Sequence, residues 1–315
     1  MKQTGRTLLG VLLAVVGLLV VLPSGCDRAG APVRRDIERS IEFVAADDIG
    51  GAELILKRGA TVLIGELHGT WEIPLVVASL ARMAMHDGLT TVVCVELAAS
   101  EQSSLDAFLN SDGGADATDA LFRGPHWQHQ DGRASVGMFG MLELMRRLRA
   151  GGGDIRVVAM DASLLSAGEG EGMAELANQR DREMGRNVIR ARKDFPDALI
   201  LALAGNVHAN IKKGAPWDEG YAPMGWHVHE ALPQVIGLNI ETAGGESWGT
   251  RAEGTGVSSV RGEDRGDHPF VEMHVNADTG YHGRLYVGRI TAAKPVLVID
   301  GGYRDIAPES LVGGD

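Results

Sequence analysis

Two short glycine-histidine turns contain the residues of this chain that could do chemistry. Gly65-Glu66-Leu67-His68 follows the apolar segment 61–64, and Gly205-Asn206-Val207-His208 follows the apolar segment 199–204. Imidazole groups beside carboxylates can activate water, bind a divalent metal ion or stabilise an oxyanion. In open α/β sheets, catalytic groups gather beyond the carboxyl ends of the strands, so we expect both histidines at one polar site.

Carboxylates also follow two other apolar segments. Glu96 follows the segment 90–95, and Asp161 follows the segment 155–160. A single such residue can serve as a turn or cap group. A strand that is buried on both faces has little reason to end in an unpaired carboxylate, however, and four polar strand ends favour convergence on one cleft.

These residues permit two kinds of hydrolytic site. In the first, the two histidines and neighbouring carboxylates hold a divalent ion such as manganese or zinc through nitrogen and oxygen, and the ion activates water. In the second, a histidine oriented by a glutamate deprotonates water without a metal, and the other histidine or an arginine stabilises the oxyanion. Spacing does not decide between them. We expect neither a serine hydrolase nor a phosphate-binding loop, and the metalloprotease pattern H-E-x-x-H does not occur.

Three further residues could support the cleft. Glu72 falls in the first turn of an expected helix, where a carboxylate either serves the site or interacts favourably with the helix dipole. Arg180 shares a helix face with Asn187. The guanidinium of Arg180 is either aimed at the site from this face or left in solvent. Asn206, in the second glycine-histidine turn, is the third.

The roles of two other histidine pairs stay open. His126-Trp127-Gln128-His129 begins a polar stretch that continues to Arg133. This stretch could cover the cleft, with Trp127 stacking on a substrate, or could be a surface loop. Trp226-His227-Val228-His229 has the alternation of a strand, which would place both histidines on one face.

Strands and helices are expected to alternate along the chain. Apolar, β-branched segments predict strands at 61–64, 90–95, 155–160 and 198–204, and helical spacing predicts helices at 73–85, 135–149 and 172–193. This order predicts an α/β fold, with a mainly parallel central sheet flanked by helices and a site at the C-terminal ends of the strands. Further strands are expected at 234–240, 270–275 and 295–299, and a flexible loop at 244–267.

The first 25 residues have the pattern of an export signal. Lys2 and Arg6 precede the apolar run 8–22, which is short for a stable membrane span. Small residues before Cys26 resemble a bacterial lipobox, so we expect a lipoprotein that is lipidated on Cys26 after cleavage; plain secretion and an uncleaved anchor are the alternatives. The expected organisation is a signal peptide at 1–25, a tether at 26–45 and one domain at 46–315.

The net charge argues against nucleic acid as a partner. The full chain has a formal charge of -12, and removal of residues 1–25 takes away two positive charges and no negative ones, which gives -14. The second cysteine, Cys94, lies in an expected strand, so we interpret it as a buried, inert thiol.

Taken in order, the motifs resemble the superfamily that groups the Tiki and TraB proteins, the erythromycin esterases and the ChaN haem-uptake lipoproteins. The resemblance spans about residues 61–210. It rests on GELHGTWE at 65–72, the strand ending in Glu96, RDREMGRN at 180–187 and GNVHA at 205–209.

The members of this superfamily imply different functions. Similarity to Tiki proteins implies a metal-dependent protease with His68, Glu96 and His208 as ligands. Similarity to erythromycin esterases implies hydrolysis of a lactone by Glu66, His68, Glu96 and His208 without an obvious metal. Similarity to ChaN implies a haem-binding lipoprotein with tyrosine as the iron ligand. The tyrosines of this chain are Tyr221, Tyr281, Tyr286 and Tyr303.

We therefore expect a hydrolase of an ester, lactone or peptide bond in a small molecule or peptide. His68 would position or activate water, with Glu66 and Glu96 as base or ligands, and His208 would be a second ligand or an oxyanion stabiliser. The alternative is a haem- or iron-binding lipoprotein without catalysis. The expected location is the bacterial cell envelope, periplasmic or at the outer membrane, with the lipid on Cys26 as anchor; the alternative is secretion.

Overall fold

The computed structural model describes residues 49–162, 172–215, 217–251, 254–274 and 279–296. The expected signal peptide, Cys26, the tether and Tyr303 lie outside these residues, as does most of the strand expected at 295–299. None of the described helices is long and apolar enough to cross a membrane.

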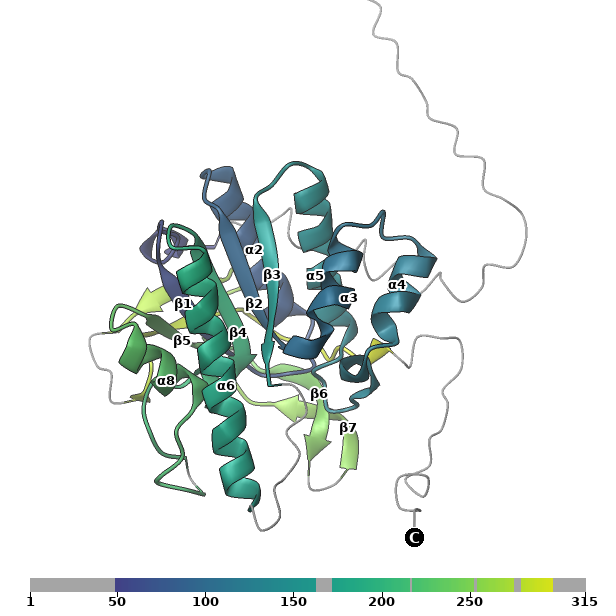
Figure 1. Ribbon diagram of the computed structural model, residues 1–315. Coiled ribbons are helices and arrows are strands. Elements are labelled where there is room, and N and C mark those ends of the chain that lie inside the picture. Colours follow the sequence, from purple (N-terminus) through teal and green to yellow (C-terminus); the bar gives the residue numbers. More distant parts are fainter. Residues whose placement is uncertain (1–48, 163–171, 216, 252–253, 275–278, 297–315) are drawn as a thin grey trace, which may run out of the picture.

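A seven-stranded sheet forms the centre of the described structure, in the order β3-β2-β4-β1-β5-β9-β8 (Figure 1). Neighbouring strands are parallel except for the edge strand β8, which runs antiparallel to β9. This confirms the predicted α/β fold with a mainly parallel sheet. The strands are β1 (Thr61–Glu66), β2 (Thr91–Ala98), β3 (Ile155–Asp161), β4 (Leu199–Gly205), β5 (Ile236–Glu241), β8 (Phe270–Met273) and β9 (Gly283–Tyr286).

The register of β1 and β4 brings the two glycine-histidine turns together. These central strands are direct neighbours, and Glu66 pairs with Gly205 at their last position. The chain leaves both strands at the same edge of the sheet. The turns that carry the two histidines therefore begin next to each other at this edge of the sheet.

Helices cover both faces of the sheet (Figure 1). The first face is covered by α2 (Glu72–His86) and α5 (Val136–Ala150), with α3 (Gln102–Leu109) and α4 (Ala115–Phe122) beside α5. The second is covered by α6 (Met173–Asp194) and α8 (Met224–Ala231). Short helical turns η1 (Ala52–Leu54), η2 (Ala99–Glu101), η3 (Pro125–Gln128) and α7 (Asn206–Ala209) connect these elements.

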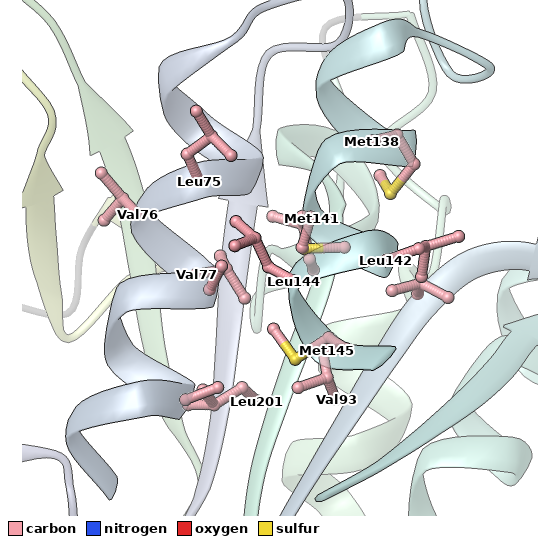
Figure 2. Packing of buried hydrophobic residues seen from close by; sticks show 14 of the residues in the cluster. Leu75, Val76, Val77, Val93, Met138, Met141, Leu142, Leu144, Met145 and Leu201 are labelled. Carbon is pink, nitrogen blue, oxygen red and sulfur yellow. The ribbon is translucent and has the colours of Figure 1, made fainter. Parts of the chain in front are cut away.

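The strands feed two hydrophobic cores because successive residues point to opposite faces. In β4, Leu201 and Leu203 pack into the core beneath α2 and α5, whereas Ile200 and Ala202 pack into the core beneath α6 and α8. Figure 2 shows Leu201 among the residues of the first core. Cys94 belongs to the second core, and burial raises the pKa of its thiol to about 12. The thiol is therefore buried and unreactive, as expected.

Two predicted elements differ from the structure. Strands β6 (Gly245–Arg251) and β7 (Gly254–Val260) pair as an antiparallel hairpin, where we expected a flexible loop. The hairpin docks through Trp248, whose backbone N–H donates to the carbonyl of Gly69 and whose indole donates to the carbonyl of Gln130. This long-range contact leaves no signal in a segment rich in glycine, serine and charge.

The segment expected as a strand at 226–229 is part of helix α8. Met224 and Val228 lie four residues apart and are both fully buried in the core beneath α6 and α8. A spacing of four matches a helix, whereas the alternation of His227 and His229 with their neighbours only imitates a strand.

Candidate functional site

The turn after β1 places His68 between two carboxylates. Its Nδ1 hydrogen-bonds Oε1 of Glu66, which is buried, and its Nε2 lies 3.6 Å from Oε2 of Glu96. Burial alone would lower the pKa of His68, but the charges of Glu66 and Glu96 raise it to about 9. The His68 imidazole is therefore protonated at neutral pH.

Arg180, from α6, ties the ends of β2 and β3 together. Its Nε and Nη2 bind Oδ1 and Oδ2 of Asp161 at 2.8 and 2.7 Å, and Nη2 also lies 2.5 Å from Oε1 of Glu96. The other oxygen of Glu96 accepts from the backbone N–H of Gly205 at 2.9 Å. Burial would raise the pKa of Glu96, but the nearby charges of His68 and Arg180 hold it well below its usual range. Glu96 is thus a carboxylate at every pH at which the protein would work.

A fully buried carboxylate, Asp181, orients His208. Its Oδ1 lies 2.8 Å from Nδ1 of His208 and accepts from the backbone N–H of Met224, and its Oδ2 accepts from the hydroxyl of Tyr221 at 2.6 Å. Since an ionised carboxylate only accepts hydrogen bonds, we assign a proton to Nδ1 of His208.

The other nitrogen of His208 contacts a guanidinium group. Nη1 of Arg180 lies 3.2 Å from Nε2 of His208. A guanidinium group can only donate, so Nε2 accepts through its lone pair. We therefore assign His208 a single proton, on Nδ1, with its Nε2 lone pair directed into the cluster.

Gly205 allows the two histidines to approach each other. A Cβ atom at this position would lie 3.0 Å from Nε2 of His68 and 3.4 Å from Cδ2 of His208. Any side chain here would displace one of the rings. The glycine of the second turn is thus required by the packing of the site.

A second guanidinium group comes from the polar stretch after η3. Nη1 of Arg133 lies 3.8 Å from Oε1 of Glu96 and 4.0 Å from Oδ2 of Asp161. Asp131 holds Arg133 in place through Nε and Nη2, at 2.9 and 2.6 Å. Two positively charged side chains, Arg133 and Arg180, therefore face Glu96 from two different segments of the chain.

The structure brings most of the sequence-based candidates into this cluster, namely Glu66, His68, Glu96, Asp161, Arg180 and His208. Glu72 instead accepts from the backbone N–H and the hydroxyl of Thr291, both at 2.7 Å, and so holds the segment after β9. Asn206 begins α7 with an exposed side chain beside the cluster.

Sequence reasoning missed Asp181, Tyr221 and Arg133 as site residues. Asp181 had a usable signal, because it lies at helical spacing with the apolar residues Met184 and Val188. A carboxylate on the buried side of a helix must be paired. Tyr221 reaches the site through tertiary packing alone.

The two open histidine pairs lie outside this hydrogen-bonded cluster. Trp127 is fully buried in the core beneath α2 and α5, so it cannot stack on a substrate. Burial and the nearby charge of Arg133 lower the pKa of the neighbouring His126 to about 4, so this ring is neutral. His227 and His229 lie on α8.

The sequence GESWG at 245–249 matches the serine-hydrolase motif G-x-S-x-G, although we expected no such site. Ser247 lies within strand β6, is almost fully buried, and accepts from Nη2 of Arg251 at 3.4 Å. A nucleophile elbow is a turn between a strand and a helix that exposes its serine. This segment is therefore not a catalytic serine site.

The predicted metal ligands do not fit a metal ion in this arrangement. Among the described residues, no group of three or more His, Cys, Asp or Glu side chains is placed to hold one. The guanidinium of Arg180 contacts both Glu96 and His208 and takes the Nε2 lone pair that a metal would need. The Arg180 guanidinium thus occupies the position that the metal ion would take.

The described tyrosines do not fit a haem-iron ligand. Tyr221, Tyr281 and Tyr286 are buried, and burial raises the pKa of the first two, which opposes the phenolate that would bind iron. Their hydroxyls donate to Asp181, the backbone carbonyl of Asn206 and that of Gly266, respectively.

No family model and no curated protein matches this chain. Its fold is similar to that of a Bacillus cereus structural-genomics protein, at 9% identity over 82% of this chain and 99% of that chain, with a TM-score of 0.56. A succinoglycan biosynthesis protein matches at 10% identity over 86% and 93%, with a TM-score of 0.54. At these identities the similarity shows the fold alone.

Two weaker structural matches come from groups that the sequence motifs resemble. The erythromycin esterase EreC matches at 15% identity over 71% of this chain and 79% of that chain, with a TM-score of 0.47. Haem-binding ChaN of Campylobacter jejuni matches at 14% identity over 66% and 89%, with a TM-score of 0.39.

Proposed function

We propose that this cleft hydrolyses an ester, lactone or peptide bond. The observation that carries the proposal is the pair of histidines on either side of Gly205, each held by its own carboxylate. Their contacts favour a protonated His68 and a His208 with a free lone pair. Hydrolysis needs a base for the attacking water and an acid for the leaving group, and this pair supplies both.

His208 is the base in this proposal. Its Nε2 lone pair takes a proton from water as the water oxygen bonds to the acyl carbon. Asp181 then stabilises the imidazolium through Nδ1, as a buried carboxylate does in other histidine-dependent hydrolases. Arg180 keeps its two bonds to Asp161 while its Nη1 turns from His208 to the developing oxyanion.

His68 is the acid. Its Nδ1 proton is held by Glu66, and its Nε2 proton is transferred to the leaving oxygen or nitrogen as the bond to the acyl carbon breaks. The proton taken up by His208 and the one lost by His68 balance over the cycle. These proposed roles differ from the roles expected from the sequence, in which His68 activates water and His208 is a second ligand or an oxyanion stabiliser. The reason is that the carboxylates beside His68 keep it protonated, while Arg180 requires a lone pair on His208.

We also propose that the protein acts in the bacterial cell envelope, anchored by a lipid on Cys26. The export pattern of residues 1–25 supports this location. A Cys26→Ser variant, expressed in its bacterial host, should move from the membrane fraction to the soluble envelope fraction. Wild-type protein in the soluble fraction would contradict the anchor.

The first test of the proposed function is turnover by the purified protein. We expect hydrolysis of p-nitrophenyl acetate and of at least one unactivated ester or lactone, with rates proportional to enzyme concentration. A panel of short peptides tests the amide alternative in the same format. Turnover of none of these substrates above a heat-denatured control would contradict the proposal.

A further inference from the structure

A pocket of about 330 Å³ opens beside the Glu66–His68 pair. Its walls come from the ends of β1 and β5, the first residue of α7, residues 260–263 and one residue of β9. Glu66 both lines this pocket and holds His68. The volume lies at the small end of the range for ligand sites, so it suits a single ring-sized group.

The three glutamates and two arginines that line the pocket balance once the protonated His68 beside Glu66 is counted. Glu241 is bound by Arg284 at 3.1 Å, and Glu66 by its histidine. The remaining two charged side chains, Arg261 and Glu263, are opposite in sign, exposed and two residues apart. The pocket therefore has no excess charge of either sign to attract a charged ligand, which favours a neutral ligand.

Two carboxamides line the pocket together with the hydroxyl of Thr242, which accepts from the backbone N–H of Gly244. Asn206 and Asn239 both line it, and each offers an N–H donor and a carbonyl acceptor. Asn239 pairs with Gly65 in the sheet register, and the backbone of Asn206 is fixed by the hydroxyl of Tyr281. A Cβ atom at position 65 would lie 2.7 Å from that hydroxyl, so the glycine makes this arrangement possible. Hydroxyl groups, which also both donate and accept, match such carboxamides.

We propose that this pocket binds one neutral, polyhydroxylated ring, such as a sugar residue, in the alcohol part of the substrate ester. We place the ring in the alcohol part of the ester because His68 protonates the leaving alcohol in the proposed reaction, and its partner Glu66 lines the pocket. This inference rests on the proposed hydrolysis and adds the class of alcohol that the enzyme releases.

Two matched esters test the subsite. Methyl 6-O-acetylglucoside and cyclohexylmethyl acetate both release a primary alcohol next to a six-membered ring, and only the first carries ring hydroxyls. We expect kcat/KM to favour the sugar ester by about tenfold or more in the wild type. Asn239→Leu and, separately, the exposed Asn206→Leu should bring this ratio close to one. Asn110→Leu, on the surface at the end of α3, should keep it.

A binding experiment separates this inference from the proposed function. Saturation-transfer NMR with methyl glucoside should show contact with the wild type that weakens in Asn239→Leu. That result without turnover of either ester would reject hydrolysis and keep the subsite. Equal rates for the two esters, or a preference unchanged in both asparagine variants, would reject the subsite and keep hydrolysis.

Discussion

The Nη1 atom of Arg180 lies 3.2 Å from Nε2 of His208, and this contact sets the character of the cleft. Because the guanidinium can only donate, it fixes the lone pair of His208 on the nitrogen that faces the cluster. Arg180 also binds Glu96 and Asp161, so one side chain connects the ends of β2 and β3 with the turn after β4.

Metal removal should leave the activity unchanged. Arg180 fills the position between Glu96 and His208 that a metal ion would take, so catalysis in this account uses no ion there. Dialysis of the purified protein against EDTA, followed by an ester assay, checks this. Loss of activity that zinc or manganese restores would show that Arg180 moves away to admit a metal.

The pH profile should report the proton on His68. Its pKa is raised to about 9 by Glu66 and Glu96, so kcat/KM should fall as the pH rises through about 9 and the acid is lost. Glu66→Gln removes one negative charge, lowers the pKa of His68 and moves this alkaline limb to lower pH. A limb that stays in place in Glu66→Gln would assign it to another group.

The same proton links stability to pH. The folded pKa of His68 lies above its ordinary value of 6.5, so its interaction with the two carboxylates stabilises the fold fully below pH 6.5. That stabilisation is lost as the pH rises through about 9. Urea unfolding of the wild type and of His68→Gln at pH 6 and pH 10 should show the larger pH dependence in the wild type.

Asp181→Asn should damage both stability and activity. The carboxylate accepts from His208, Tyr221 and Met224 while fully buried, and an amide would turn N–H groups toward these donors. We expect a loss of about 1–3 kcal/mol in unfolding free energy and a fall in kcat of about 10²-fold or more. Tyr221→Phe, which removes a single donor, should cost less in both assays. Equal effects of the two variants would point to a packing role for Asp181.

Gly205→Ala should disable the site with little effect on folding. The added methyl group would lie 3.0 Å from Nε2 of His68, so the ring must shift, and misplacement by about 1 Å can cost about 10²-fold in rate. The matched control is Gly256→Ala on the β6–β7 hairpin, where an added Cβ meets nothing within 4 Å. Full activity of Gly205→Ala would show that the two rings do not need this close approach.

The sequence predicted the central strands well, for identifiable reasons. Apolar runs such as 199–204 are buried on both faces, which gives a continuous hydrophobic signal. The polar residues at the C-terminal ends of β1 to β4 meet because parallel strands end at one edge of the sheet. Strand β9 was missed, since it has four residues and begins at Gly283. The hairpin was missed because its docking depends on a contact between Trp248 and Gly69, far apart in the chain.

Protonation states lay beyond what the sequence can provide. The pairing of Glu66 with His68 could be predicted from the sequence, because the two residues lie two positions apart. The distance from Glu96 to His68 could not, because it depends on the packing of β1, β2 and β4. The neutral state of His208 follows from Arg180, which arrives on a helix that starts after β3. These contacts are the reason why the roles that we propose for the two histidines differ from those that we expected.

The most direct test of the account compares ester hydrolysis by the wild type, His208→Gln and His68→Gln. We predict that each variant loses about 10²- to 10⁴-fold in kcat/KM, while the circular-dichroism melt stays within a few degrees of the wild type, and that only His208→Gln retains the alkaline limb near pH 9. Full activity in either variant, with folding intact, would contradict the assignment of base and acid in this cleft.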